Sequence, residues 1–287
     1  MTRYAKPTSL EDALGLLSGG TWRVLAGGTD FYPALGSRPL REDVLDINGL
    51  AALEGIEETD AHIVIGGRTS WSRLISAPLP AAFDALKAAA REVGAVQVQN
   101  AGTIAGNLCN ASPAADGVPP LLVLDAEVEL RSVHGSRHLP LPDFLLGNRQ
   151  TARRSDELVT AIRVPKARAA GGSAFFKLGA RRYLVISIAM AAVRLVAAED
   201  GTIGEAAVAV GACSAVAMRL PLLEAALVGR RLKDGLERFV EDVHFAQLSP
   251  IDDVRGSADY RRLAAQEIVA RTIAKAAGGK PTTAAAA

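Results

Sequence analysis

The chain has 287 residues, which is more than one compact domain usually holds and enough for two domains or one domain with sizeable lobes. Its 32 Lys+Arg and 31 Asp+Glu residues give a formal charge of +1, without the basic excess typical of nucleic-acid binding. The two cysteines, Cys109 and Cys213, exclude a multi-disulfide framework and are not spaced to hold zinc or an iron–sulfur cluster. The N-terminus has no apolar signal-peptide core and no long apolar run follows, so we expect a soluble, cytoplasmic chain without a membrane span.

The first part of the sequence predicts a small βαβ-like unit. An amphipathic helix over residues 9–17 opens with a serine and has acidic residues in its first turn. A strand over 22–26 runs directly into the glycine pair 27–28, and a second strand over 43–47 follows a short crossover. A strand that ends on glycines leaves a bare backbone turn at its carboxyl end.

The middle of the chain repeats this order of strand, glycine pair and helix. A strand over 62–67 precedes a short helix over 71–75, and a strongly helical run covers 81–93. Residues 97–116 differ, because small, polar and glycine residues stand where a helix or strand would show apolar periodicity. We therefore predict an irregular loop that allows close approach of the backbone.

The rest of the chain predicts more strands followed by helices. A helix opens at Pro119, a strand over 126–131 has an antiparallel neighbour at 138–139, and a further strand covers 157–164. The glycine-rich, charged segment 166–172 is the expected lobe boundary. Beyond it we expect a hairpin of strands 186–196 and 203–211, helices over 221–228, 232–243 and 258–276, and a low-complexity tail over 278–287 that is disordered.

Two segments combine glycines with hydroxyl and amide side chains, residues 25–30 (L-A-G-G-T-D) and 101–116. A diphosphate needs backbone N–H groups at close range, and glycine permits both the approach and the positive φ angles that aim successive amides at one anion. Thr29, Thr103, Asn107 and Ser112 would add neutral donors. Either segment alone is equally well explained as a tight turn, and their occurrence together favours a nucleotide cofactor.

Several other chemistries lack their motifs. The sequence has no G-x-G-x-x-G fingerprint, no G-x-x-x-x-G-K-[ST] loop and no G-x-S-x-G elbow. His134 and His138 are four residues apart, but Gly135 and Pro140 disfavour the helix that would bring them together on a metal. We interpret all four histidines as structural or surface residues.

Four ordered motifs resemble the FAD-binding medium subunit of the molybdenum hydroxylases, the xanthine dehydrogenase and carbon monoxide dehydrogenase family. Residues 24–31 resemble its V-L-A-G-G-T-D loop, and residues 103–116 its T-I-G-G-N-x-x-x-A-S-P-x-x-D stretch, with Ala105 where glycine is usual. Residues 176–182 are similar to its F-x-K-x-x-x-R segment, and residues 250–262 to its D-x-R-G-S-A-x-Y-R motif. The resemblance spans almost the whole chain in the expected order.

The resemblance implies an α+β fold with a two-subdomain FAD-binding lobe of the vanillyl-alcohol-oxidase-like type and a C-terminal α/β lobe with a small antiparallel sheet and helices. It implies subdomains over 1–58 and 59–168, a C-terminal lobe over 173–277 and the tail 278–287. The cofactor contacts that it implies are Val24, Leu25, Ala26, Gly27, Gly28, Thr29, Asp30, Phe31, Thr103, Ile104, Ala105, Gly106, Asn107, Asp116, Val159 and Lys177.

Individual roles follow from this resemblance. It places residues 26–30 on the FAD pyrophosphate, Asp116 on the ribose or adenine side, and Lys177 beside the flavin ring, where a cation tunes the reduction potential. No acid–base catalytic residue and no metal ligand is implied. We interpret Cys109 as a small, inert packing residue. We expect the motif from Asp253 to Tyr260 to order the C-terminal helix by Asp–Arg pairing.

The resemblance implies an oxidoreductase subunit that passes electrons from [2Fe–2S] clusters of a small subunit through FAD to an external acceptor. A large molybdopterin subunit performs the hydroxylation, and the complex is commonly a dimer of heterotrimers. Two alternatives stay open at this point, a self-contained flavin oxidoreductase of the same broad fold and a non-catalytic scaffold in which the glycine loops are only turns.

Overall fold

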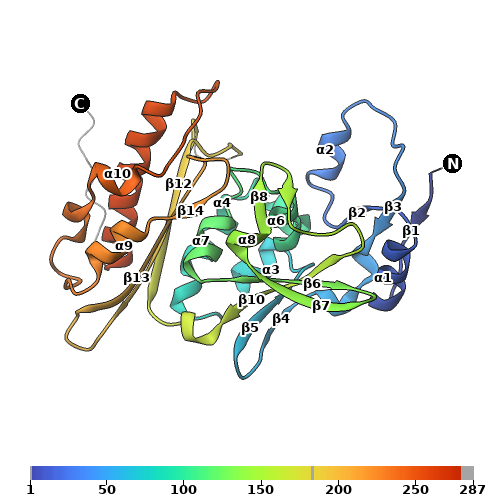
Figure 1. The fold of residues 1–287 in the computed structure, drawn as a ribbon, viewed down its shortest axis with the longest axis horizontal. Helices are drawn as coiled ribbons and strands as arrows, with labels where there is room; N and C mark the ends of the chain where they lie inside the picture. Colours follow the sequence, from blue (N-terminus) through green and yellow to red (C-terminus); the bar gives the residue numbers. More distant parts are fainter. Residues whose placement is uncertain (1, 182–183, 279–287) are drawn as a thin grey trace.

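The structure, a computed structural model, describes residues 2–181 and 184–278 (Figure 1). These residues form a mixed α+β fold with three main sheets, and strand β1 and helix α10 lie at opposite ends of it. No helix within the described residues is long and apolar enough to cross a lipid bilayer. The predicted tail lies outside the described residues from 279 onward, as does Arg182 of the third motif.

The N-terminal sheet is parallel and has the order β1-β3-β2. Its strands are β1 (Tyr4–Ala5), β2 (Arg23–Leu25) and β3 (Val44–Asp46), joined by α1 (Leu10–Ser18) and α2 (Phe31–Leu35). The Ser9 hydroxyl caps α1 by accepting the Asp12 N–H at 3.1 Å, and Leu14 and Leu17 pack with Leu45 in a small core. The predicted βαβ-like unit is confirmed, and the carboxyl ends of its strands meet at one edge.

The second sheet is antiparallel, with the order β4-β5-β10-β6-β7. The pairing of Val128 with Leu139 confirms the predicted antiparallel neighbour. Strand β4 ends before residue 59, within the expected first subdomain, but it pairs with β5 and so belongs to this second sheet. Its strands are β4 (Ile56–Glu58), β5 (His62–Gly66), β6 (Glu127–Ser132), β7 (Gly135–Pro140) and β10 (Leu158–Pro165), and a separate small hairpin consists of β8 (Leu145–Gly147) and β9 (Gln150–Thr151).

Six helices accompany this sheet: α3 (Trp71–Ser76), α4 (Asp84–Glu92), α5 (Val96–Ala101), α6 (Ile104–Asn110), α7 (Val118–Val123) and α8 (Leu141–Phe144). The expected irregular loop over 97–116 is therefore wrong, because most of it forms α5 and α6. In α6, Ile104 and Leu108 are the large apolar side chains on the buried face, and together they span only one helical repeat. Such a short stripe gives no periodicity in the sequence, and tertiary packing stabilises the helix instead.

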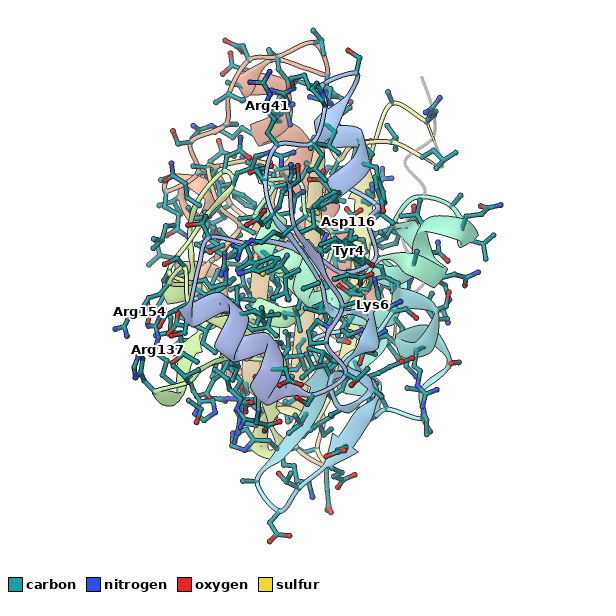
Figure 2. The ribbon with its side chains drawn as sticks, turned by 90° about the vertical axis from the view of Figure 1, so that its right-hand side faces the viewer. Tyr4, Lys6, Arg41, Asp116, Arg137 and Arg154 are labelled. Atoms are coloured by element: carbon teal, nitrogen blue, oxygen red, sulfur yellow. The ribbon has the colours of Figure 1, made fainter. Side chains whose placement is uncertain are left out.

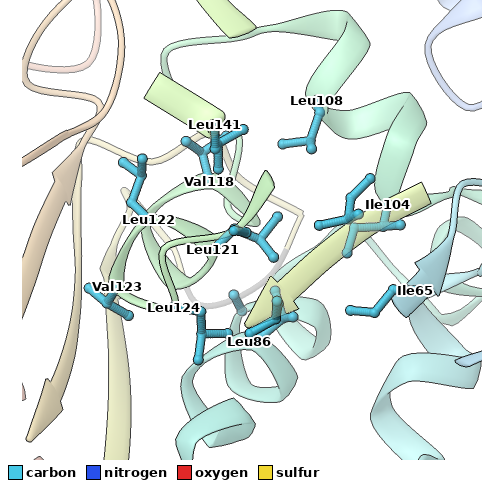
Figure 3. Close-up of a cluster of buried hydrophobic side chains, with 14 of the residues drawn as sticks. Ile65, Leu86, Ile104, Leu108, Val118, Leu121, Leu122, Val123, Leu124 and Leu141 are labelled. Atoms are coloured by element: carbon cyan, nitrogen blue, oxygen red, sulfur yellow. The ribbon is translucent and has the colours of Figure 1, made fainter. Parts of the chain in front are cut away.

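The main core lies between these helices and the second sheet (Figure 3). Leu86 of α4, Leu121 of α7 and Ile104 of α6 are almost completely buried there, together with Ile65 of β5. The same core includes Met190 of the C-terminal sheet. The C-terminal sheet is therefore packed directly onto the second sheet and its helices rather than linked to them loosely.

The C-terminal sheet is antiparallel, with the order β11-β12-β13-β14. Its strands are β11 (Gly172–Leu178), β12 (Ala189–Ala197), β13 (Ile203–Gly211) and β14 (Met218–Arg219), and its helices are α9 (Pro221–Leu227) and α10 (Ala258–Ala276). One face of the sheet packs on α4 and α7, and the other packs on α9 and α10.

The predicted hairpin of β12 and β13 and the predicted helices α9 and α10 are confirmed. The predicted helix over 232–243 is wrong. Two 3₁₀ turns, η5 (Leu236–Phe239) and η6 (Asp242–Phe245), stand near that position. Gly235 has a positive φ of 65°, and this left-handed residue interrupts the helical backbone immediately before the first turn.

Candidate functional site

The two glycine-containing segments predicted from the sequence meet in the structure. A Cβ atom at Gly27 would lie 1.8 Å from the carbonyl oxygen of Ala101, so only glycine fits this contact. On the other side of the contact, a Cβ atom at Gly102 would lie 3.4 Å from the Thr29 hydroxyl oxygen. The turn after β2 therefore packs against the junction of α5 and α6.

The first segment presents unpaired backbone donors. Gly28 has a φ of 73°, which turns the chain sharply between β2 and α2. Within the described chain, the N–H groups of residues 27–30 donate no hydrogen bond to a protein atom. A series of free amides in a turn of this kind binds an anion.

The second segment is different, because its backbone amides already have partners. The Thr103 hydroxyl caps α6 by accepting the Gly106 N–H at 3.1 Å, and Ile104 donates its N–H to Thr69 O at 3.1 Å. Ala105 is an ordinary helical residue without a positive φ, so the usual glycine is not required at this position. This segment offers side chains, not free amides, to a ligand.

Both segments line one pocket of about 730 Å³. The pocket lies between the N-terminal sheet and the second lobe, and it continues along β2 toward residues 41–43. Trp71, Val93 and Val159 supply apolar walls. Asn107 lines the same pocket, and its buried Oδ1 atom has no hydrogen-bond partner within the described residues. A cleft with apolar walls and convergent polar groups is typical of a cofactor site.

Twelve of the sixteen predicted contact residues line this pocket. They are Val24, Ala26, Gly27, Gly28, Thr29, Asp30, Phe31, Thr103, Ala105, Gly106, Asn107 and Val159. Leu25 and Ile104 are buried with 7% and 1% of their surface exposed, and they do not line it. Successive side chains of a strand point to opposite faces, which turns Leu25 away from the pocket. Ile104 lies on the face of α6 that is turned toward the core.

Asp116 and Lys177 do not line the pocket, and they pair with each other instead. The Lys177 Nζ atom donates to Asp116 Oδ2 at 2.6 Å, and the two side chains are 6% and 9% exposed. Ser187 donates to the other carboxylate oxygen at 2.8 Å, and Lys177 also approaches Glu92 O at 3.5 Å. Burial raises the pKa of the Asp116 carboxyl, although the Lys177 ammonium and the Ser187 hydroxyl act in the opposite direction.

This ion pair is connected to the pocket through chain neighbours. Glu92 precedes Val93, which lines the pocket. Asp116 precedes Gly117, where a Cβ atom would lie 2.9 Å from Asn107 Oδ1. The pair also joins the two lobes, because Lys177 belongs to β11 and Asp116 stands just before α7.

The pocket contains residues that the motifs did not indicate. Arg153 lines it together with Arg23 and Arg41, and Trp71 is almost fully buried in its wall. The cations come from separate loops and strands without a shared motif. A clue was available for Trp71, because this large apolar residue opens the short helix predicted after the strand and its glycine pair.

The packing interpretation of Cys109 is wrong. Cys109 is exposed and lines the pocket at the end of α6. Protein atoms nevertheless surround the sulfur closely, and this burial raises the pKa of the thiol to about 11. Its expected inertness at neutral pH thus has an electrostatic cause, since the thiolate is the reactive form.

The prediction for the motif from Asp253 to Tyr260 is confirmed. Asp253 pairs with Arg255 at 2.9 Å and with the buried Arg261 at 2.6 Å. Arg261 also donates to Ile188 O and Ala212 O, so it connects the start of α10 to the C-terminal sheet. This motif is outside the pocket and organises the C-terminal lobe.

Fold and site together define a protein with a pocket suited to a phosphate-containing cofactor, between a parallel βαβ-like unit and an antiparallel sheet. Comparison with known proteins gives the family. Residues 1–167 match the FAD binding domain in molybdopterin dehydrogenase, and residues 174–276 match the CO dehydrogenase flavoprotein C-terminal domain. The chain belongs to the FAD-binding medium subunits of the carbon monoxide dehydrogenase and xanthine dehydrogenase family, and it is the flavoprotein subunit of an oxidoreductase.

Individual relatives match over nearly their full length. The nicotine 6-hydroxylase medium subunit of Paenarthrobacter nicotinovorans is 31% identical over 277 residues, 96% of both chains. The glyceraldehyde dehydrogenase medium chain of Sulfolobus acidocaldarius is 33% identical over 265 residues, 90% of this chain and 92% of that one. The solved carbon monoxide dehydrogenase of Hydrogenophaga pseudoflava that lacks the Mo-pyranopterin moiety has a TM-score of 0.86 at 30% identity, covering 96% of this chain and 97% of that chain.

Proposed function

We propose that this chain is the electron-transfer flavoprotein of a molybdenum-dependent hydroxylase. It holds FAD between the [2Fe–2S] clusters of a small partner subunit and an external electron acceptor. A large molybdopterin subunit carries out the hydroxylation, and the complex is a dimer of heterotrimers. Bound FAD supplies the exchange between one-electron and two-electron carriers.

The free amides of residues 27–30 are the observation that supports this proposal most directly. Residues 27–30 line the pocket, their four consecutive N–H groups have no acceptor within the described residues, and Gly27 packs closely against Ala101. Such a turn suits the doubly charged pyrophosphate of FAD. Asn107 adds a buried polar atom that still lacks a partner within the described residues.

The remaining residues divide the work by position. Thr103 and Asn107 present polar groups to the cofactor along α6, whereas Val93 and Val159 exclude water from the apolar part of the pocket. Lys177 is the proposed flavin-tuning residue, since its ammonium group approaches Glu92 O, and the next residue, Val93, lines the pocket. A positive charge there favours negative charge on the reduced flavin, and Asp116 moderates that effect.

The names of the relatives support the quaternary part of the proposal. They describe medium subunits and chains of a nicotine hydroxylase, a glyceraldehyde dehydrogenase and a carbon monoxide dehydrogenase. These substrates have little in common, while all three relatives are 30–33% identical to this chain. We therefore assign substrate choice to the large partner subunit.

Gly27→Ala tests the proposed pyrophosphate site, because the added Cβ would meet the Ala101 carbonyl. The matched control is Gly15→Ala in α1, where a Cβ meets no atom within 4 Å. In the purified complex, we expect the wild type and Gly15→Ala to retain stoichiometric FAD and Gly27→Ala to lose it, with unchanged circular dichroism. A wild-type complex that contains no FAD and cannot be reconstituted with it would reject the proposal.

The electron-transfer role has its own test. Lys177→Met should change the reduction potential of the flavin more than it changes FAD retention. Steady substrate turnover by the isolated chain, without its partners, would favour a self-contained flavin oxidoreductase instead.

A further inference from the structure

The carboxyl end of β3 carries a polar network next to the glycine turn. Asp46 ends this strand, and the 3₁₀ turn η1 (Ile47–Gly49) follows it. The Asp46 Oδ1 atom accepts the Asn48 backbone N–H at 2.8 Å and the Asn48 Nδ2 group at 2.8 Å. β3 is the central strand of its sheet, so this network lies beside the end of β2.

Asn48 uses its second amide hydrogen on the glycine turn itself. Its Nδ2 atom donates to Ala26 O at 2.8 Å. Because both partners of the side-chain amide are oxygen acceptors, only the NH₂ group can face them, and the orientation of the amide is determined. Asp46 therefore holds Asn48, and Asn48 holds the carbonyl of Ala26.

The geometry of the peptide bond carries this contact into the pocket. In a trans peptide the C=O group and the following N–H group point in opposite directions, and the described chain contains no cis peptide bond. Asn48 does not line the pocket, whereas Ala26 and Gly27 do. A hydrogen bond that holds Ala26 O on the side of Asn48 thus turns the Gly27 N–H away from Asn48.

We propose that Asn48 is a positioning residue that aims the Gly27 N–H at the cofactor pyrophosphate. This inference rests on the proposed function, because it requires FAD in this pocket. The role is not one of apolar packing, since Asn48 is exposed to solvent. Its effect passes through one carbonyl group.

The carboxylate of Asp46 is itself held by residues at the β1 edge of the sheet, opposite β2. Tyr4, on β1, donates its hydroxyl to Asp46 Oδ2 at 2.5 Å, and Lys6 Nζ lies 4.0 Å from the same oxygen. Both residues are labelled in Figure 2. Asp46 is only 6% exposed, and although burial acts to raise its pKa, the hydrogen bonds from Tyr4 and Asn48 hold the pKa below its usual value. The carboxylate stays charged and keeps Asn48 in place.

Two variants of the full-length chain in its complex test this role. Asn48→Ala removes both side-chain donors, and Asn48→Asp places carboxylate oxygens against the two acceptors. Asn148→Ala, at an exposed asparagine in the turn between β8 and β9, is the matched control. After removal of FAD, each protein is titrated with FAD and, separately, with ADP, which contains the diphosphate without the flavin.

We expect both Asn48 variants to bind FAD and ADP about tenfold more weakly than the wild type. Loss of one hydrogen bond to a charged group implies an effect of this size. Asn48→Asp should be the weaker binder of the two. The ³¹P resonances of bound FAD should shift in the Asn48 variants, which a general loss of stability would not cause. The thermal midpoints of the FAD-free proteins should agree with that of the Asn148→Ala control.

Wild-type affinity and unchanged ³¹P resonances in both Asn48 variants would overturn the inference. A lowered thermal midpoint with an unchanged ³¹P spectrum would also overturn it, because Asn48 would then have a structural role only. Neither result affects the proposed FAD site, which fails only if the wild type itself binds no FAD.

Discussion

Replacing Lys177 by methionine keeps the length of the side chain and removes the ammonium group from the ion pair with Asp116. The pair is buried, so the remaining carboxylate cannot be hydrated and keeps the Ser187 hydroxyl as its donor. Removing one partner of a buried ion pair typically costs about 3–5 kcal/mol of unfolding free energy. We expect a loss in this range at pH 7.

The ordinary pKa of aspartate sets an upper limit on the electrostatic part of this loss. Asp116 can avoid an uncompensated charge by binding a proton. From the reference pKa of 3.8, protonation costs about 4.4 kcal/mol at pH 7 and about 1.6 kcal/mol at pH 5, at roughly 1.4 kcal/mol per unit. The electrostatic part of the penalty in Lys177→Met should therefore shrink to about one third between pH 7 and pH 5.

The direction of the pH dependence follows from linkage. Burial already raises the pKa of Asp116, and loss of Lys177 raises it further. A carboxyl group with a higher pKa in the folded than in the unfolded state adds stability below its ordinary pKa. That stability is lost as the pH rises through the folded-state value. The difference between wild type and Lys177→Met therefore widens from pH 5 to pH 7.

Urea unfolding at pH 5, 6 and 7, followed by circular dichroism at a fixed FAD concentration, measures this difference. The double variant Lys177→Met/Asp116→Asn is the control, because it has no charge at either position. The unfolding free energy of the double variant should differ from that of the wild type by less than that of Lys177→Met does at pH 7, and this difference should be nearly independent of pH. A single variant whose penalty is equal at pH 5 and pH 7 would refute the reasoning.

Three further results are expected. Arg261→Met should lower the unfolding free energy by about 3 kcal/mol, seen as a lower thermal midpoint, because Ile188 O, Ala212 O and Asp253 lose a buried donor. The backbone N–H of the turn and the paired arginines lower the pKa of Asp253 to about 2, so wild-type stability should fall between pH 4 and pH 2 more steeply than that of Asp253→Asn, measured by urea midpoints. Alkylation of Cys109 by iodoacetamide should be slow at pH 7, accelerate toward pH 11 and decrease when FAD is added; fast labelling at pH 7 would contradict the raised pKa.

The first glycine turn could be predicted from local sequence because its determinants are local. A strand that ends at Leu25 and runs into two glycines requires a sharp turn at the edge of a sheet. The sequence shows that Gly27 is glycine, but it does not show the contact that requires it. That contact is with Ala101, which reaches the site only after the second lobe has packed against the first sheet.

The second segment shows where local reasoning failed. Its glycines and hydroxyl groups indicated a turn with free amides like the first, whereas the structure uses these amides to build α6. Thr103 caps the helix and Thr69 accepts the Ile104 N–H. Whether an N–H group is free depends on acceptors distant in the sequence, so a motif identifies a donor type without showing whether the donor is available.

Asp116 and Lys177 illustrate the same limit in charged residues. Separate motifs indicated both, each with its own cofactor contact, and the structure pairs them across 61 positions of sequence. The pairing arises because β11 packs against α4 near the start of α7, and this packing is a property of the two lobes together. One cluster thus supports the contact between the lobes and also adjoins the cofactor pocket. The stability of a Lys177 variant must therefore be measured before its reduction potential is interpreted, because a shifted lobe and a lost charge would both change the flavin environment.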